Sequence, residues 1–530
     1  MRRLAFIALL FATANALHAQ VRPEALRAHM RFLSDDALEG RGTGTRGFRI
    51  AARYVAAQLE TFGVPATFQN VPFRSTLPIG ERSSIVLTRD DGTSATLRFA
   101  EGFVSSGDIL SEDATVEAPV VFAGYGITAP DRQYDDYAGI DAKGKIVAYF
   151  ADAPPSFPSD LRAHYSSSYE KARNAAQHGA VGTLSLVTPS DEERAPWPRR
   201  VRQSKLGSMY WLEQSGAPHA ARPELKASAT LSQSGLAALF EGAPTPLADV
   251  IVSIGKGNPR PFAMPVKARI SIASRHTKVE SPNVVGVLRG ADPKLGNEYV
   301  VYSAHLDHLG ISDPVDGDRI NNGALDNASG IAAMLEIARA FSELPQRPRR
   351  SIIFLAVTGE EKGLRGADYF ANNPTVPAAS IVANINIDEI LMFHPVRDVT
   401  PIGAEHSTLE AVVQKVAREQ HVDVSPDPYP EEVVFVRSDQ YPFVKAGIPA
   451  VYVGAGYRAV DPAYNILQDT MTWIKTIYHT PKDEMSQPIE YAVGVQVANF
   501  DFGIGLEVAN ADDRPAWKKG DFFGETFGHK

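Results

Sequence analysis

The chain has 530 residues, of which 44% are hydrophobic and 22% are charged, and its formal net charge is −9. This composition is typical of a globular protein long enough for two domains. The acidic balance leaves no basic excess for phosphate groups, so we expect no nucleic-acid partner. The absence of cysteine excludes disulfides, thiolate metal sites, a cysteine nucleophile and a lipid anchor on cysteine.

The N-terminus has the pattern of a secretory signal peptide. Met1-Arg2-Arg3 is basic, residues 4–14 are apolar, and Leu17-His18-Ala19 offers small residues for cleavage. The apolar run is shorter than the roughly 20 residues that a spanning helix needs, which favours removal over a membrane anchor. We therefore expect residues 1–19 to be cleaved. The mature protein is then exported to a bacterial periplasm or the medium, without attachment to a membrane.

We expect the first part of the mature chain to be helical. Residues 24–63 have apolar side chains at helical spacing, interrupted by a glycine-rich turn at 40–44. Residues 67–73 then look like a strand.

The sequence pattern changes between about residues 80 and 270. Short strand-like runs alternate with turns and with one helix near 169–177. The proline- and arginine-rich stretch 194–202 is expected to be a loop. This part predicts an inserted, β-rich domain at 111–264, with residues 20–110 and 265–530 forming the domain that surrounds it.

After Pro282 the pattern becomes strand–helix–strand. The expected helix at 326–341 carries Asp326-Asn327 at its N-terminal cap. Alternating strands and helices predict an α/β fold, a mainly parallel mixed sheet flanked by helices on both faces. The expected strands lie at 283–288, 299–303, 351–357, 381–387 and 450–453.

Candidate metal ligands lie next to these strands. His305, Glu360, Glu361 and Asp388 each follow a strand closely, and the carboxyl ends of parallel strands are where α/β sheets bind ligands. Asp326 opens a helix, so we expect its carboxylate at the same edge. Imidazole and carboxylate groups without cysteine suit a pair of zinc ions acting on water.

Several of these residues have an alternative interpretation. Asp326 by itself would be a helix cap, but a carboxylate can also bridge two cations. Asp307 can accept the second N–H of a ligating His305 and fix its tautomer, whereas His308 is interpreted as a residue of the surrounding pocket. Of the adjacent Glu360 and Glu361, one can bind metal while the other moves a proton.

Taken in order, these motifs resemble the di-zinc aminopeptidases of metallopeptidase family 28. The resemblance extends over nearly the whole mature chain and implies a zinc exopeptidase-like fold. One position departs from the pattern, because family members often have histidine where this chain has Gln440. The segments that carry the resemblance are 38–44 (Leu-Glu-Gly-Arg-Gly-Thr-Gly), 303–308, 325–330, 358–361, 386–389, 437–443 and 478–481.

The resemblance also implies roles for single residues. His305 and Asp388 would bind one zinc ion, Glu361 and His479 the other, and Asp326 would bridge the two. Glu360 would be the general base, and Asp307 would orient His305.

The insert resembles a protease-associated (PA) domain. The segments 122–127, 135–137, 143–147 and 171–180 carry this second resemblance. By analogy, such a domain would lie beside the catalytic cleft and limit the size of substrates.

We expect a di-zinc exopeptidase, most simply an aminopeptidase that binds peptides by their free N-terminus, with Tyr478 as a donor to the developing oxyanion. A glutamate-type carboxypeptidase or dipeptidase is the alternative, and it would need a basic pocket, for which Arg437 and Arg458 are candidates. A glutaminyl cyclase would use one zinc ion, and a receptor-like binding protein would have lost its ligands. The complete ligand set argues against these last two.

Overall fold

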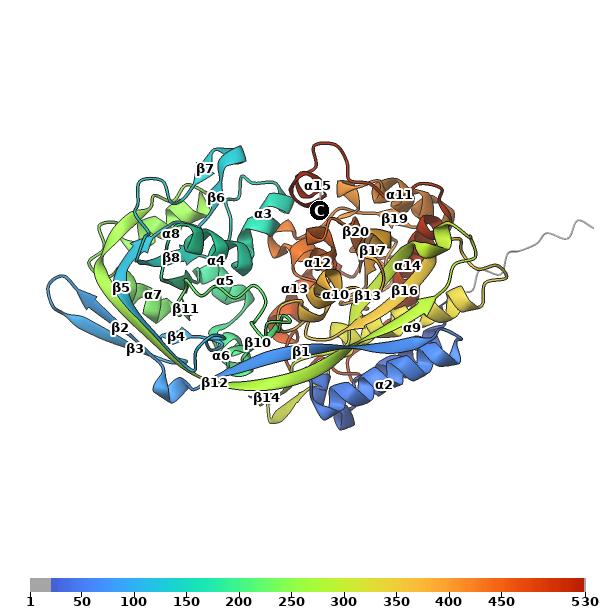
Figure 1. The fold of residues 1–530 in the computed structure, drawn as a ribbon, viewed down its shortest axis with the longest axis horizontal. Helices are drawn as coiled ribbons and strands as arrows, with labels where there is room; N and C mark the ends of the chain where they lie inside the picture. Colours follow the sequence, from blue (N-terminus) through green and yellow to red (C-terminus); the bar gives the residue numbers. More distant parts are fainter. Residues whose placement is uncertain (1–20, 529–530) are drawn as a thin grey trace, which may run out of the picture.

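The computed structural model describes residues 21–528, so the predicted signal peptide lies outside the described residues. One continuous sheet runs through two halves, each with its own hydrophobic core (Figure 1). We call residues 84–272 the inserted half and the remainder the main half. Among residues 21–528, no helix combines the length and the apolar character needed to cross a membrane.

Four parallel strands form the centre of the main half. β16 (Ser351–Val357), β13 (Tyr299–His305), β17 (Ile381–Asn386) and β20 (Ala450–Ala455) are neighbours in this order. They are buried along nearly their whole length, as expected for strands covered on both faces. The mainly parallel mixed sheet is therefore confirmed. Antiparallel strands flank it on both sides: β12 (Phe262–Leu288) next to β16, and β18 (Asp398–Ile402) next to β20.

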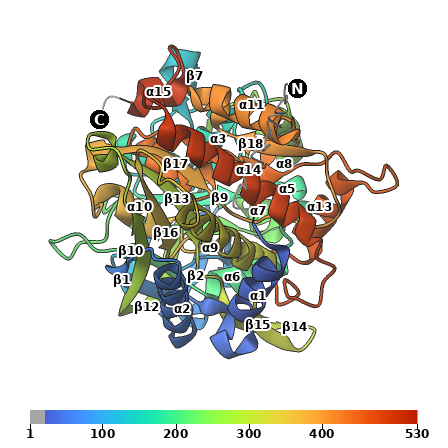
Figure 2. The same cartoon turned by 90° about the vertical axis from the view of Figure 1, so that its right-hand side faces the viewer.

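Helices cover both faces of this sheet. α9 and α14 lie side by side across one face (Figure 2), and their apolar side chains join the largest core cluster. The opposite face packs against two shorter helices, α10 (Arg365–Asn372) and α12 (Gln440–Lys445). The helices of the first face are α1 (Pro23–Leu33), α2 (Arg46–Thr61), α9 (Ser329–Ser342), α11 (Leu409–Gln420) and α14 (Tyr491–Asn510).

A long two-stranded ribbon joins the halves. β1 (Ala66–Pro78) pairs antiparallel with β12 along its whole length, from Ala66 opposite Gly286 to Pro78 opposite Ser274. β12 continues into the inserted half, where it pairs with β2 (Ser84–Arg89) and β5 (Asp113–Phe122). The strand expected at 283–288 is thus only the last part of a 27-residue strand (Figure 1).

The inserted half has a core of its own. Four parallel strands form it: β5, β8 (Ile146–Phe150), β9 (Gly182–Leu186) and β11 (Ala227–Leu231). This core also includes Ile85, Leu87, Leu97 and Phe103, which lie before the predicted start of the insert at residue 111. The helices of this half include α3 (Ser159–Ser166), α4 (Ser168–Gln177), α7 (Gln233–Phe240) and α8 (Leu247–Gly255).

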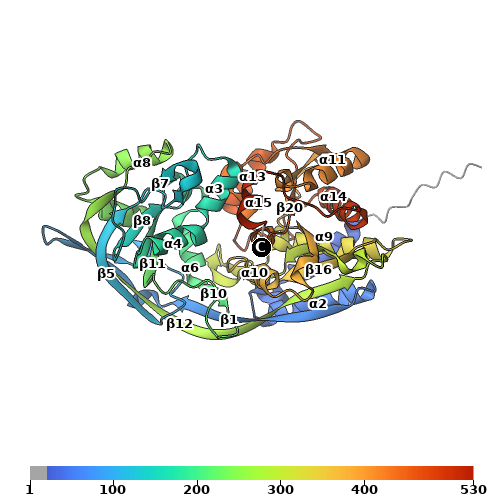
Figure 3. The same cartoon turned by 45° about the horizontal axis from the view of Figure 1, so that its top comes forward.

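The prediction of a loop at 194–202 is wrong. Helices α5 (Pro189–Arg194) and α6 (Trp197–Lys205) occupy this region. Pro198 lies in the first turn of α6, where a helix needs no amide donor, so the proline that suggested a loop fits the start of a helix. α3 of the inserted half and α13 (Ile466–Thr476) of the main half lie where the two halves meet (Figure 3).

Candidate metal centre

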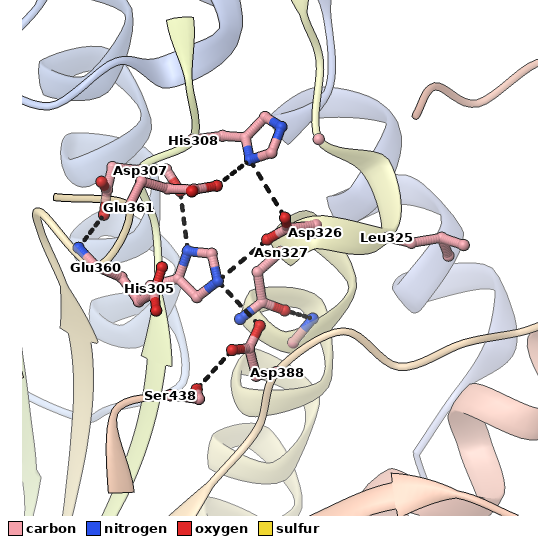
Figure 4. Close-up of polar contacts among 12 residues, drawn as sticks. His305, Asp307, His308, Leu325, Asp326, Asn327, Glu360, Glu361, Asp388 and Ser438 are labelled. Atoms are coloured by element: carbon pink, nitrogen blue, oxygen red, sulfur yellow. Dashed lines mark hydrogen bonds and ion pairs between the residues drawn. The ribbon is translucent and has the colours of Figure 1, made fainter. Parts of the chain in front are cut away.

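The ends of three parallel strands bring the first group of candidate ligands together. β13 ends at His305, Glu360 follows β16, and Asp388 follows β17, so all three lie at the same edge of the sheet. His305 Nε2 is 2.9 Å from Asp388 Oδ1 and 3.2 Å from Asp326 Oδ1 (Figure 4). The sequence-predicted trio of His305, Asp326 and Asp388 is therefore one buried cluster.

Asp326 does not cap the helix that follows it. α9 begins at Ser329, and Asp326 has non-helical backbone angles, with φ −111°. The capping contact comes from Asn327, whose Oδ1 accepts the Gly330 amide at 2.9 Å. The amides of Leu325 and Asp326 donate to the carboxylate of Asp483, each at 2.9 Å. The Asp326 carboxylate is thereby free to face the cluster, and Asp483 is a supporting residue that the sequence did not reveal.

A second group shares the Asp326 carboxylate. His479 Nε2 is 3.1 Å from Asp326 Oδ2 and 3.2 Å from Glu361 Oε2. His308, interpreted from the sequence as a pocket residue, also belongs here, with Nδ1 2.6 Å from Glu361 Oε1 and 3.7 Å from Asp326 Oδ2. Its position just beyond the end of β13 was the only sequence signal for this contact.

The donor atoms fit metal ions. Asp326 Oδ2, Glu361 Oε1 and both ring nitrogens of His308 are buried without a well-aligned hydrogen bond, although Asp326 Oδ2 is close to His479 Nε2 and Glu361 Oε1 is close to His308 Nδ1. Unpaired polar atoms in a protein interior cost free energy, and most are satisfied by some partner. Imidazole nitrogens and carboxylate oxygens are the ligands that zinc takes when thiolates are absent. The two groups, joined at Asp326, therefore suit cations.

The electrostatics of the buried cluster support the same conclusion. Burial raises the pKa of Glu360 well above its usual value, and Glu361 and Asp439 raise it further. Burial also raises the pKa of Glu361 to about 7, against the opposing effect of His479. At His305 burial alone would lower the pKa, but Asp388 and Glu360 outweigh it and raise the pKa well above the usual value. The carboxylates around His305 thus favour a positive charge at this point.

Asp307 contacts His305 in a way that differs from the prediction. Its main-chain carbonyl, not its carboxylate, is 3.0 Å from His305 Nδ1. The carboxylate instead accepts the Thr43 hydroxyl at 2.8 Å and the Glu360 amide at 3.1 Å. Asp307 therefore holds both the imidazole and the backbone of the glutamate pair.

Gln440 lies behind Asp388 and links two segments. Its Oε1 accepts from Asn386 Nδ2 at 2.8 Å, and its Nε2 donates to the Phe435 carbonyl at 2.9 Å. The hydroxyl of Ser438 donates to Asp388 Oδ2 at 2.5 Å (Figure 4). Gln440, at the position where family members often have histidine, is thus buried, and both polar atoms of its side chain form hydrogen bonds.

A cavity of about 170 Å³ opens onto the cluster. Glu360, Glu389, Arg437 and Tyr478 line it together with His305, Asp326 and His479. Arg437 is within 3.3 Å of Glu432, which also lines the cavity. Arg458, the second arginine considered for a basic pocket, lies elsewhere and pairs with Asp423 at 2.7 Å.

Comparison with known proteins finds relatives that match parts of this chain. The "Probable zinc metalloprotease" of Pyrenophora teres f. teres is 35% identical over 112 residues, 21% of this chain and 23% of that protein. The chain thus spans about a quarter of that relative's length. The "Probable glutamate carboxypeptidase" of Arthroderma benhamiae is 25% identical over 512 residues, 82% of this chain and 65% of that one.

Among solved structures, the aminopeptidase from Aneurinibacillus sp. strain AM-1 superimposes with a TM-score of 0.55 at 18% identity, over 93% of this chain and 96% of that one. At this identity the likeness concerns the fold, and it confirms the fold class predicted from the sequence. Residues 283–499 match the model of peptidase family M28. This part of the chain is therefore similar to peptidase family M28, and the matched segment contains His305, Asp326, Glu360, Glu361, Asp388 and His479.

Proposed function

We propose that the protein is a zinc-dependent aminopeptidase that removes residues from the free N-terminus of peptides. The observation that carries this proposal is the Asp326 carboxylate, whose two oxygens face two different histidines at 3.2 and 3.1 Å at the base of a cavity. A shared carboxylate of this kind is suited to two cations held close together.

The residues divide naturally between two ions. His305 and Asp388 would hold one zinc ion, Glu361 and His479 the other, and Asp326 both; His308 lies close enough to Glu361 to support the second group. When bound, the zinc ions would lower the pKa of water and polarise the scissile carbonyl.

Glu360 is suited to move protons. Its side chain lines the cavity beside both groups, and in this assignment it is not needed as a ligand. It would take a proton from the attacking water and return it to the leaving amine nitrogen. Tyr478 also lines the cavity, and burial followed by the charge of Glu389 raises its pKa well above the usual value. The phenol therefore stays protonated and can donate to the developing oxyanion.

The charges around the cavity favour a free amine over a carboxylate. Glu389 lines the cavity in addition to the ligand carboxylates, and the guanidinium of Arg437 is 3.3 Å from Glu432, a carboxylate that Arg194 also contacts. A terminal ammonium would be attracted to such a site, whereas the acidic substrate of a glutamate-type carboxypeptidase would need an unbalanced positive charge.

The inserted half is proposed to be the PA domain that restricts access to the cavity. Arg194 of α5 is 3.2 Å from Glu432, so this half contacts the cavity wall directly. Export of the protein through a signal peptide remains part of the same proposal.

The test is hydrolysis of aminoacyl-p-nitroanilides beside N-acetylated peptides, with and without a chelator and with zinc restored. Chelator-sensitive cleavage of free-amine substrates alone would support the aminopeptidase. Release of C-terminal residues from blocked peptides would move the assignment to a carboxypeptidase. Inactivity towards both would contradict the peptidase proposal.

A further inference from the structure

Helix α6 of the inserted half reaches the loop that carries His479. Arg199, which is buried, donates from Nη2 to the main-chain oxygens of Ile474 at 2.8 Å and Lys475 at 2.6 Å. Both carbonyls belong to the last turn of α13, where a helix leaves its carbonyl groups without intrahelical donors. Arg199 thus ties the inserted half to the helix end that immediately precedes Tyr478 and His479.

Gln203 lies one helical turn beyond Arg199, on the same face of α6. Its side-chain amide is 2.6 Å from His479 Nδ1. The other ring nitrogen, Nε2, faces Asp326 and Glu361 at 3.1 and 3.2 Å. The imidazole of His479 is therefore held between the carboxylates of the main half and an amide of the inserted half.

If His479 binds a cation, the state of its imidazole ring determines which hydrogen-bonding group Gln203 must present to Nδ1. A nitrogen that binds a cation uses its lone pair, so the proton of a neutral His479 would be on Nδ1. The partner of Nδ1 must then be an acceptor. A half-turn of the Gln203 amide exchanges its nitrogen and oxygen and places Oε1 against this proton.

We propose that the inserted half completes the metal centre, with Gln203 as the positioning residue for His479 and Arg199 as the anchor that places α6. This inference rests on the proposed function, since it assigns His479 as a zinc ligand. His479 has a left-handed backbone conformation, with φ 57°, which is uncommon for a residue other than glycine. The contacts from α6 reach the helix end before this residue and its side chain.

Zinc affinity of the full-length protein tests the proposal independently of turnover. The metal-free protein is titrated with zinc in competition with a chromogenic chelator, for wild type, Gln203→Met and Gln203→Glu. Methionine keeps the length of the side chain but cannot accept the Nδ1 proton, so we expect the site that contains Glu361 and His479 to lose about 10- to 100-fold in affinity, while the other site is unchanged. Glutamate keeps an acceptor, so we expect affinity equal to or tighter than wild type.

Gln233→Met is the matched control. Gln233 lies in α7 of the same half and donates to the Val187 carbonyl at 2.8 Å, within the inserted half. This variant should bind zinc as wild type does. If Gln203→Met does not fold, judged by its thermal unfolding, Gln203→Ala replaces it.

The outcomes separate this inference from the proposed function. Wild-type affinity in Gln203→Met, or equal losses in Gln203→Met and Gln203→Glu, would overturn the role of Gln203 while leaving the zinc peptidase intact. A wild-type protein that binds no zinc would overturn both.

Discussion

Asp326 and His479 meet through Oδ2 and Nε2 at 3.1 Å, while the other oxygen of the same carboxylate is 3.2 Å from His305 Nε2. One side chain therefore belongs to both groups of candidate ligands. Its loss should affect two ions at once.

We expect Asp326→Asn to lower the zinc content from the proposed two ions per chain to one or fewer and to reduce kcat/KM by more than about 100-fold. The amide keeps the shape but removes the negative charge that both cations would share. Metal content is measured by mass spectrometry after dialysis against metal-free buffer. Asp423→Asn, which removes an exposed partner of Arg458, is the control. Unchanged zinc stoichiometry in Asp326→Asn would contradict the bridging role.

Glu360→Gln should separate metal binding from proton transfer. We expect full zinc content with kcat reduced by about 10²- to 10⁴-fold, since glutamine cannot accept a proton from water. KM should change little because the cavity keeps its shape. The measurement is steady-state kinetics on the best aminoacyl substrate. A rate close to wild type would show that another group is the base.

Removal of the metal should destabilise the fold as well as abolish activity. Burial raises the pKa values of Glu360 and Glu361, so keeping these carboxylates ionised depends on nearby positive charge. Zinc at 1,000 times its dissociation constant would stabilise the folded state by about 4 kcal/mol per site. Calorimetry with and without chelator should show a lower Tm without metal, for wild type and for Glu360→Gln alike. Coincident melting curves would contradict this expectation.

The contact between the halves should weaken in acid because of His164. This residue of α3 is 2.9 Å from the Tyr441 hydroxyl of α12, and burial, with the positive charges of Arg173 and Lys445, lowers its pKa to about 3. Between pH 3 and 6.5 the unfolded chain therefore binds a proton that the folded protein does not, so stability falls as pH falls through this range. The expected slope is about 1.4 kcal/mol per pH unit.

His164→Gln keeps a polar partner for Tyr441 and removes the titrating group. We expect a flatter pH dependence of the free energy of unfolding, measured by denaturant titration between pH 4 and 7. The same slope in wild type and variant would show that other groups control the acid response.

The pattern of apolar residues in single segments was sufficient to predict the parallel strands at the centre of the sheet. The continuous apolar run of β16 is typical of a strand covered on both faces, and strands of one direction bring their ends to one edge. His305 and Asp388 could therefore be placed together from the sequence, although the geometry of their contact could not. Glu360 was likewise placed at this edge by its position after β16.

The predictions that differ from the structure depend on contacts distant in sequence or on backbone groups. Pro196 and Pro198 carried the signal of a loop, but both suit the start of α6. That Asn327 rather than Asp326 caps α9 depends on one main-chain conformation. The contact of Gln203 with His479 has no signature in either segment, because it exists only when two separately folded cores meet.

The ribbon of β1 and β12 restricts how those cores can move. Its ladder is continuous from Ala66 opposite Gly286 to Pro78 opposite Ser274, so sliding one half along the other would break many hydrogen bonds together. A twist about the long axis of the ribbon would leave this ladder paired. Such a twist would move α6 together with the inserted half, so the contact of Gln203 with His479 depends on the angle between the halves.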